Sequence, residues 1–190
     1  MEPLCVKLVI VGSHHNGKTT LLNSYNANEY YVITWNPGIV DNISVRINTD
    51  GRERIVSFWD TAAQSDYDRL RPLSYYQTDV FLLTFSCVNR KSFTEVTDKW
   101  FPEIRHHCPD TPILLVATKS DLRENTEVPR ERIVTKQEGE NLAKQLGCMY
   151  FETSSLTGKG LRIVFETAAH IDSWSFQQRK QEKEKKCFLS

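Results

Sequence analysis

The stretch Gly12-Ser13-His14-His15-Asn16-Gly17-Lys18-Thr19 decides the fold of this chain, because it has the spacing G-x-x-x-x-G-K-[ST]. It follows an apolar run at residues 4–11, which predicts a buried strand, and it precedes a helical pattern. Strand, glycine-containing turn and helix together form a P-loop, in which backbone N–H groups and the helix N-terminus hold a phosphate group. The motif therefore predicts a site for a nucleoside diphosphate or triphosphate, and a chance match in a turn is the alternative.

Each part of this motif has an expected role. Lys18 reaches the terminal phosphates, and the Thr19 hydroxyl binds magnesium. The residues expected along the phosphates are Gly12, Ser13, His14, His15, Asn16, Gly17, Lys18, Thr19 and Thr20.

The size and composition of the chain narrow the class of protein. A length of 190 residues suits one domain with a full core, and 39% hydrophobic with 25% charged residues is typical of a soluble globular protein. The formal net charge is zero, which gives no electrostatic reason to expect nucleic acid as a partner. The five cysteines are odd in number and widely spaced, and no signal-peptide pattern begins the chain. We expect a reduced, cytoplasmic protein.

Short apolar runs alternate with helical patterns along the chain, which predicts βαβ units and a largely parallel sheet. The predicted strands are 4–11, 43–48, 54–59, 79–85, 112–118 and 148–152, and the predicted helices are 17–26, 65–76, 91–107, 136–146 and 158–176. The turn signal Asn48-Thr49-Asp50-Gly51 predicts that the second and third strands are antiparallel. The fold class is thus α/β, a doubly wound sheet of six strands flanked by helices, with ligands at the carboxyl ends of the strands.

Polar groups follow three of these strands. Asp60 ends the third strand, where a carboxylate holds magnesium through a water, although a helix N-cap looks the same in sequence. Thr118-Lys119-Ser120-Asp121 ends the fifth strand. There the carboxylate of Asp121 suits the N1–H and 2-amino donors of guanine, and adenine offers neither. The stem of Lys119 lies over the base in this interpretation, and a solvated turn is the alternative.

After the sixth strand, Glu152-Thr153-Ser154-Ser155 offers backbone N–H groups to guanine O6, a weak signal by itself. Ser154 and Ser155 complete the predicted guanine site.

These motifs together resemble the Ras superfamily of small GTPases over nearly the whole chain. Resemblance to its Rho/Rac branch comes from DYDRLRPLSY at 66–75, TDV at 78–80, KWFPE at 99–103, CP at 108–109 and TKSDLR at 118–123. The resemblance implies a monomeric GTP/GDP switch with Mg²⁺, acting on actin regulators and other effectors. It also implies control by exchange factors, activating proteins and dissociation inhibitors. Gln64 resembles the catalytic glutamine that orients the attacking water.

Two departures from the family pattern affect hydrolysis. His14 stands where the family mostly has glycine, and a side chain there crowds the arginine that an activating protein inserts, a contact worth about 10³–10⁵ in rate. A histidine that points to solvent is the alternative. Ala63 replaces the glycine of D-x-x-G, so it keeps the N–H for the γ-phosphate but disfavours positive φ.

A third departure lies in the first switch loop. When Lys18 and Asp60 are both aligned with the family pattern, one residue is inserted between them, and Gly38 falls at the position of the family's magnesium-binding threonine. Thr34 can take that position only if the alignment has a deletion and a compensating insertion. We favour Gly38. Tyr30 falls at the aromatic position that covers the guanine edge, and a tyrosine in a solvated loop is the alternative.

The predicted G domain spans residues 1–176, and the composition changes sharply at 177–190. This basic tail ends in Cys187-Phe188-Leu189-Ser190, a C-a-a-X prenylation box with Cys187 as the lipidated residue and a terminal serine that favours farnesyl. One lipid chain binds a membrane only marginally, so the basic residues act as a second anchor. We expect a location at the inner face of the plasma membrane or another cytosolic membrane surface.

Two functional hypotheses follow. The first is a Rho-like GTP/GDP switch with slow, poorly stimulated hydrolysis. The second is a pseudo-GTPase that stays in one nucleotide state and acts as an effector-binding scaffold, as His14, Ala63 and Gly38 suggest.

Overall fold

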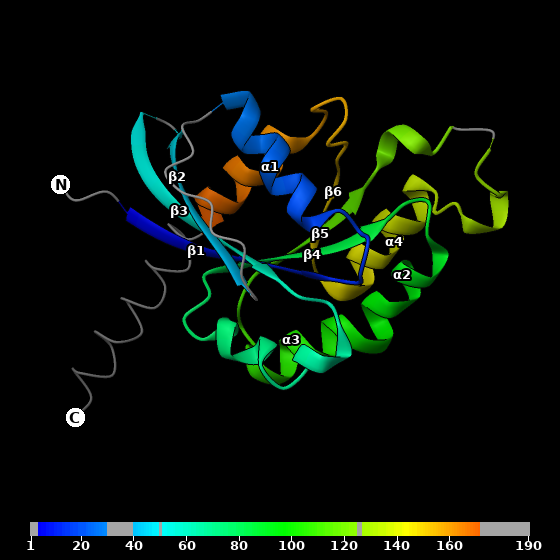
Figure 1. The fold of residues 1–190 in the computed structure, drawn as a ribbon, viewed down its shortest axis with the longest axis horizontal. Coiled ribbons are helices and arrows are strands. Elements are labelled where there is room, and N and C mark those ends of the chain that lie inside the picture. Colours follow the sequence, from blue (N-terminus) through cyan, green and yellow to red (C-terminus); the bar gives the residue numbers. More distant parts are fainter. Residues whose placement is uncertain (1–3, 30–39, 50, 125–126, 172–190) are drawn as a thin grey trace.

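A single mixed sheet forms the centre of the molecule (Figure 1). The computed structural model describes residues 4–29, 40–49, 51–124 and 127–171. Its sheet has six strands in the order β2-β3-β1-β4-β5-β6. Their bounds are β1 Leu4–Gly12, β2 Val40–Thr49, β3 Arg52–Thr61, β4 Val80–Ser86, β5 Ile113–Thr118 and β6 Met149–Glu152. The predicted doubly wound α/β fold is confirmed.

The strands run parallel except at one edge. β1 pairs in parallel with β3 and β4, and β5 pairs in parallel with β4 and β6. β2 pairs antiparallel with β3, as the turn signal predicted, and Gly51 in that turn has φ +71°. Because β1, β3, β4 and β5 point the same way, the residues that follow them lie together at the carboxyl end of the sheet.

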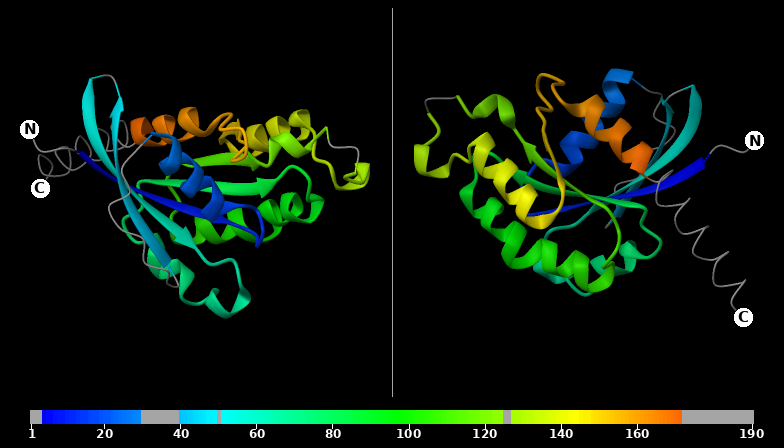
Figure 2. Two further views of the ribbon diagram at one scale, coloured as in Figure 1. Left: turned by 45° about the horizontal axis from the view of Figure 1, so that its top comes forward. Right: turned by 180° about the vertical axis from the view of Figure 1, so that it is seen from behind.

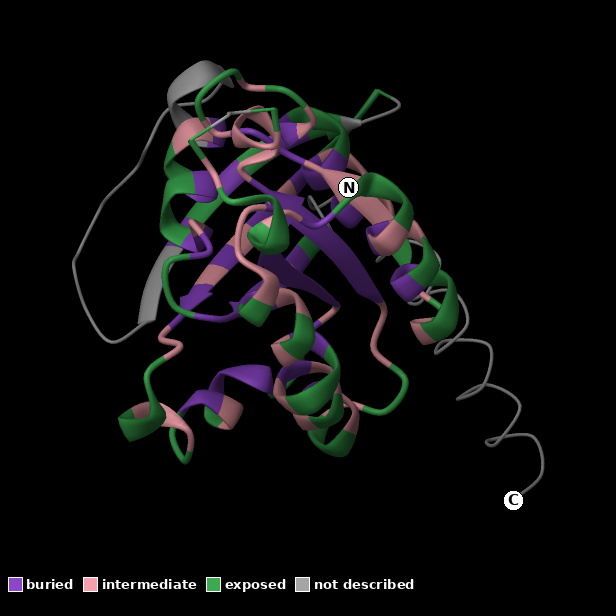
Figure 3. Ribbon diagram, turned by 90° about the vertical axis from the view of Figure 1, so that its right-hand side faces the viewer, coloured by how far each residue is buried: buried purple, intermediate pink, exposed green. Residues whose placement is uncertain are grey.

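Helices cover both faces of the sheet, as Figure 2 shows from two sides. α1 (Lys18–Glu29) and the helical residues 161–171 pack on one face, around Tyr25, Phe58 and Phe165. The other face carries α2 (Arg90–Glu95), a π-helical turn (Val96–Trp100), α3 (Phe101–His107) and α4 (Lys136–Leu146). Figure 3 shows the buried strands between these two layers. Among the described residues, no helix is long and apolar enough to cross a membrane.

The prediction of one helix at 65–76 is wrong. The structure has two short 3-10 helices there, Ser65–Tyr67 and Arg71–Tyr75. Pro72 cannot donate a backbone hydrogen bond and disfavours α geometry in the residue before it, so the segment does not continue as an α-helix.

Two other predicted helices need smaller corrections. The helix predicted at 91–107 is interrupted by the π-helical turn, which changes the side-chain phase between α2 and α3. The helix predicted at 158–176 begins only at residue 161, because Gly158 and Gly160 have φ of +76° and +75°. Its expected end at 172–176 lies outside the described residues, and so does the tail at 177–190.

Candidate nucleotide-binding site

A cavity of about 360 Å³ lies at the carboxyl ends of β1 and β3. Two segments line it. The first contributes His14, His15, Gly17, Lys18, Thr19 and Thr20, and the second contributes Asp60, Thr61, Ala62, Ala63 and Gln64. Sequence reasoning placed most of these residues at one site but missed Thr61 and Ala62, whose side chains carry no recognisable signal.

The phosphate loop takes its shape from tight backbone geometry. Gly12 has φ +148°, and a Cβ there would lie 2.4 Å from both the carbonyl oxygen and the hydroxyl of Thr84. Gly17 has φ +81°, and His15 also adopts a positive φ, of 60°. Only a glycine fits at position 12, because the loop runs directly against β4 there.

Lys18 is buried inside this loop, with 8% of its surface exposed. Its ammonium donates to the carbonyl oxygens of Gly12 at 2.9 Å and Ser13 at 3.0 Å. Burial lowers the pKa of Lys18 to about 8, since nearby Asp60 only partly offsets the desolvation and Arg71 adds to it. An anion in the cavity would therefore stabilise the charged form of Lys18.

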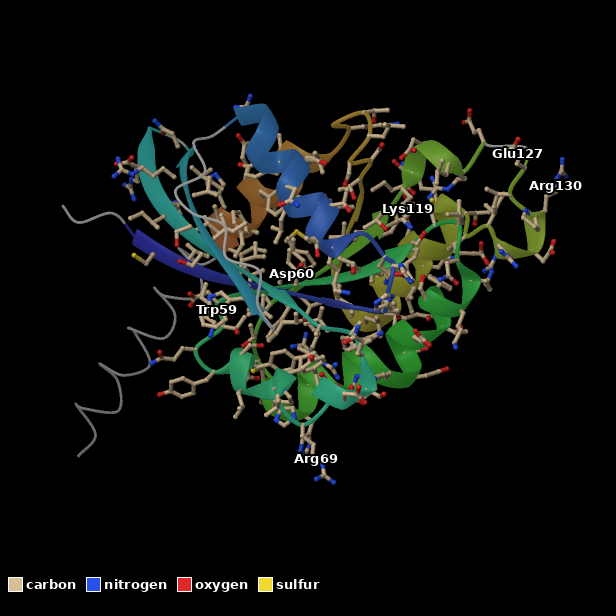
Figure 4. The ribbon with its side chains drawn as sticks, in the orientation of Figure 1. Trp59, Asp60, Arg69, Lys119, Glu127 and Arg130 are labelled. Carbon is tan, nitrogen blue, oxygen red and sulfur yellow. The ribbon has the colours of Figure 1, made fainter. Side chains whose placement is uncertain are left out.

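The residues expected to hold magnesium meet at the other side of the cavity. The hydroxyl of Thr19, in the first turn of α1, donates to a carboxylate oxygen of Asp60 at the end of β3. Asp60, near the end of β3, is labelled in Figure 4. A hydroxyl and a carboxylate are the hard oxygen ligands that Mg²⁺ prefers, so this donor set fits the ion.

Two side chains of the loop point away from the cavity. The hydroxyl of Ser13 donates to Glu95 and accepts from the indole N–H of Trp100 at 2.8 Å. The amide of Asn16 donates to the Thr84 carbonyl at 2.9 Å, and Asn16 is 1% exposed. Ser13 and Asn16 thus offer a nucleotide their backbone rather than their side chains.

The loop after β5 is tied to the phosphate loop. The Thr118 hydroxyl donates to the Asn16 carbonyl at 2.6 Å, and the Lys119 ammonium donates to the His15 carbonyl at 2.7 Å. Lys119 itself has φ 59°, and its carbonyl accepts from the Cys87 thiol at 3.1 Å. Thr118 therefore links two loops. The stem of Lys119 passes within 3.8 Å of where a Cβ on Gly17 would stand.

The two loops predicted to bind guanine are also joined to each other. The Ser120 N–H donates to the Thr153 carbonyl at 3.0 Å, and Arg123 forms two hydrogen bonds with the carboxylate of Glu152. Asp121 lies in the short 3-10 helix Ser120–Leu122. Ser154 is buried, and its hydroxyl accepts from the Thr157 N–H at 3.1 Å, while Ser155 is half-buried. None of these residues lines the cavity beside Lys18, and Lys119 connects their loop to the phosphate loop.

His14 and His15 are exposed at the mouth of the cavity. Their ring centroids lie 3.9 Å apart with the planes nearly perpendicular. Within the described part of the chain, no group of three metal-ligating side chains includes them. The pair therefore borders the cavity that Lys18 and Asp60 line.

Ala63 and Gln64 complete the cavity rim. Ala63 is not among the residues with positive φ, and it packs against the core cluster that contains Trp100. Gln64 is exposed, and its carbonyl accepts from the Tyr67 N–H at 3.1 Å. The alanine is thus accommodated without the backbone strain that positive φ would impose. Tyr30, Thr34, Gly38 and Cys187 lie outside the described residues.

A glycine-bounded anion loop at a helix N-terminus, a buried lysine and an oxygen pair for magnesium define a P-loop nucleotide-binding protein. The sequence model of the Ras family matches residues 7–172, which include both the phosphate cavity and the base loops. The chain belongs to the Ras family of small GTPases, whose members bind GTP and GDP and in general hydrolyse GTP.

Proposed function

We propose that this protein is a guanine-nucleotide switch of the Rho type, with Thr118, Lys119, Asp121, Ser154 and Ser155 at the base and the P-loop at the phosphates. The observation that carries the proposal is the bond from the Lys119 ammonium to the His15 carbonyl. This bond holds Lys119, the lysine proposed for the base, against the phosphate loop, which supports one nucleotide spanning both proposed sites. The carboxylate of Asp121 supplies the selectivity for guanine, because only guanine presents two donors to it. Tyr30 would cover the edge of the base.

Magnesium would be held by the Thr19 hydroxyl and, through a water, by Asp60. When bound, the ion neutralises charge on the phosphates. With Lys18 and Asp60 kept in register with the family pattern, Gly38 takes the place of a threonine ligand. This chain would therefore offer magnesium one hydroxyl ligand fewer than the family pattern does.

Hydrolysis is proposed to be slow. Gln64 lies at the cavity rim, where a side-chain amide can orient a water, and it is the proposed catalytic residue. His14 is exposed at the same mouth, and by the family resemblance its side chain would crowd the arginine that an activating protein inserts. The expected outcome is measurable intrinsic turnover with little stimulation.

The cellular setting is proposed from the sequence. Prenylation at Cys187 and the basic tail would anchor the protein reversibly to a cytosolic membrane surface. Its partners would be Rho-type effectors, exchange factors, activating proteins and dissociation inhibitors, with effects on the actin cytoskeleton.

Competition binding tests the nucleotide class. GTP and GDP should displace a fluorescent GDP, and ATP should not. Asp121→Asn should weaken GTP binding and improve binding of xanthosine triphosphate, because an amide matches the 2-oxo group and N1–H of xanthine. Equal displacement by ATP and GTP would overturn the guanine assignment.

Single-turnover conversion of bound GTP then separates the switch from the scaffold. Phosphate release above the rate of free GTP supports a switch. A rate at background supports a GTPase-deficient scaffold, the alternative that His14, Ala63 and Gly38 suggest.

A further inference from the structure

One arginine in the segment beside the cavity is buried although its neighbours are exposed. Arg71 has 3% of its surface exposed, whereas Leu70 is 51% exposed and Leu73 is 73% exposed. Arg69, two residues earlier, is exposed and points away from the molecule (Figure 4). A buried guanidinium needs hydrogen-bonding partners, because desolvation of an unpaired charge is costly. The partners of Arg71 indicate what it does.

The guanidinium of Arg71 contacts two residues of its own segment and one residue of α3. Nε and Nη2 donate to the carboxylate of Glu103 in α3, at 2.9 and 2.8 Å. Nη2 also donates to Asp68 at 2.5 Å, within the same segment. Nη1 donates to the carbonyl oxygen of Ala62 at 3.1 Å, and Ala62 lines the cavity. Arg71 thus connects the cavity wall to a helix behind it.

The groups that hold Arg71 are themselves held. The Tyr75 hydroxyl donates to Glu103 at 2.6 Å, and Lys99 pairs with Asp68 at 3.0 Å. Two cations and two carboxylates balance in this cluster of Arg71, Lys99, Asp68 and Glu103. Burial alone would lower the pKa of Arg71, but the bonds to Glu103 and Asp68 raise it above its ordinary value. The guanidinium is therefore permanently charged and fixed in orientation.

The same cluster reaches the phosphate loop through an aromatic ring. Arg71 lies over the indole of Trp100 at 4.6 Å from the ring centroid, and Lys99 lies at the same distance. The indole N–H of Trp100 donates to the hydroxyl of Ser13 in the phosphate loop. Arg71 is accordingly fixed relative to both walls of the cavity.

The contact with Ala62 bears on the position of Gln64. The Ala62 carbonyl is held by Arg71, and the Gln64 carbonyl is held by the Tyr67 N–H. Between these two anchors the backbone of Ala63 and Gln64 has little freedom. Arg71 does not itself line the cavity, so its shortest bonded route to a bound nucleotide is this backbone, while its charge also acts on Lys18 through space.

We propose that Arg71 is a positioning residue for hydrolysis: its bond to the Ala62 carbonyl fixes the Ala62–Gln64 backbone and so aims Gln64 into the cavity. This inference rests on the proposed function, in which Gln64 orients the attacking water. Misplacement of a catalytic group by about 1 Å costs about 100-fold in rate. Loss of the Arg71 contact should therefore slow hydrolysis while leaving the binding contacts of Lys18 and Asp121 in place.

Three variants of the full chain test this role. R71K keeps a positive charge but cannot bond Glu103 at two points and Ala62 at once. R71M/E103Q removes the charge pair together and keeps an amide oxygen for the Tyr75 hydroxyl, so it leaves no half-buried carboxylate without its cation. R69M is the matched control, because it removes an exposed arginine from the same segment.

Two measurements decide the outcome. The first is single-turnover hydrolysis of bound GTP alongside the dissociation constant for GDP. R71K and R71M/E103Q should hydrolyse GTP about 10- to 100-fold more slowly with GDP affinity within about threefold of wild type, and R69M should match wild type in both. The second is amide hydrogen exchange in the GDP-bound protein. Exchange at residues 62–65 should be faster in the two Arg71 variants, with exchange at 12–20 unchanged.

Any of three results overturns the proposal. The first is a wild-type rate of hydrolysis in R71K and R71M/E103Q, and the second is wild-type exchange at 62–65 in these variants. The third is a loss of GDP affinity as large as the loss of rate. Should wild type itself fail to hydrolyse GTP, hydrolysis is absent from the proposed function, and the exchange comparison alone decides whether Arg71 fixes this backbone. The guanine competition assay uses no Arg71 variant, so it tests the nucleotide class independently.

Discussion

The phosphate loop and the segment from Ala62 to Tyr75 border one cavity, but different kinds of contact hold them in place. The loop takes its shape from its own backbone and the strand beside it: Gly12 fits against Thr84, and Lys18 bonds the Gly12 and Ser13 carbonyls. Distant side chains such as those of Trp100 and Lys119 add further bonds to that shape. The segment is held mainly by side chains from elsewhere, with Arg71 bonded to Glu103 in α3. A locally determined loop gives a fixed anion site, whereas a segment held by distant side chains can change when those side chains move.

The largest expected effect comes from removing the cation at the centre of the segment. Arg71→Met leaves the carboxylate of Glu103, which is 17% exposed, with the Tyr75 hydroxyl as its remaining hydrogen-bond partner. Breaking a buried ion pair from one side costs about 3–5 kcal/mol, so the free energy of unfolding of the GDP-bound protein should fall by about 4 kcal/mol. Urea denaturation measures this.

The double variant R71M/E103Q provides the comparison. It should recover more than half of that loss, because no buried charge remains unpaired. If the double variant is as unstable as R71M alone, the arginine contributes by packing rather than by pairing, and the segment is less dependent on Glu103 than the geometry indicates.

A substitution in the loop should be nearly as damaging for a different reason. Gly12→Ala introduces a Cβ 2.4 Å from the Thr84 carbonyl at a φ of +148°. Backbone strain and overpacking together should lower the free energy of unfolding by about 3 kcal/mol, and bound GDP should dissociate faster.

Gly51→Ala is the matched control for that experiment. Gly51 has φ +71° with no atom within 4 Å of a new Cβ, so only the conformational cost of about 1 kcal/mol remains. Equal losses in the two variants would show that contact with β4 does not define the loop.

The contrast between the two regions also explains what the sequence could predict. The phosphate loop was predicted at residue level because its strand, glycines and helix are neighbours in the chain. The helix predicted at 136–146 coincides with α4, Lys136–Leu146, because its amphipathic pattern is local. The largely parallel sheet and the antiparallel pairing of β2 with β3 followed from alternation of strands and helices, together with one turn signal.

The conformation of residues 65–76 was not predictable in the same way. Pro72 is a local reason against the predicted helix, but the position of Arg71 depends on Glu103, 32 residues further along the chain. Nothing local marks that partner. The π-helical turn Val96–Trp100, which precedes the helix bearing Glu103, likewise leaves no periodicity that distinguishes it from an α-helix. Long-range side-chain pairs therefore limited the prediction on this side of the cavity.

The lowered pKa of Lys18 predicts a change in stability with pH that is smaller than the effects of R71M and Gly12→Ala. The pKa of Lys18 is lowered from 10.5 to about 8 in the fold. Between these values the unfolded chain binds more protons than the folded chain, so the stability of nucleotide-free protein should rise with pH, by about 2–3 kcal/mol in total. The measurement is urea denaturation from pH 7.5 to 10.5 after removal of nucleotide.

Lys18→Met is the control for this titration, since cysteines and tyrosines also ionise in that range. The difference in stability between wild type and K18M should change over pH 8 to 10.5 and should flatten when GDP occupies the site, because phosphates stabilise the ammonium. A difference that does not vary with pH would mean that Lys18 is solvated in the nucleotide-free protein.

The smallest effect is expected at the start of α4, outside the cavity, where Glu138 belongs to a local capping box with Thr135 and also pairs with Arg90 of α2. The bond from Arg90 is the main reason that the pKa of Glu138 falls to about 2, and burial opposes it. Stability from this lowered pKa is present above about pH 4.5 and is lost as the pH falls toward 2.

Glu138→Gln should therefore cost about 1 kcal/mol or less at pH 7, since the carboxylate is 38% exposed and solvent screens the pair. The cost should shrink toward zero as the pH falls from 4.5 to 2, in contrast to a pH-independent loss from packing. Arg90→Met separates the two contributions: if it costs as much as E138Q, the distant pair dominates, and if it costs little, the local capping box does. A small cost of Arg90→Met would mean that the start of α4, like the phosphate loop, is determined by local contacts. A cost equal to that of E138Q would mean that it depends on a distant side chain, like the segment around Arg71.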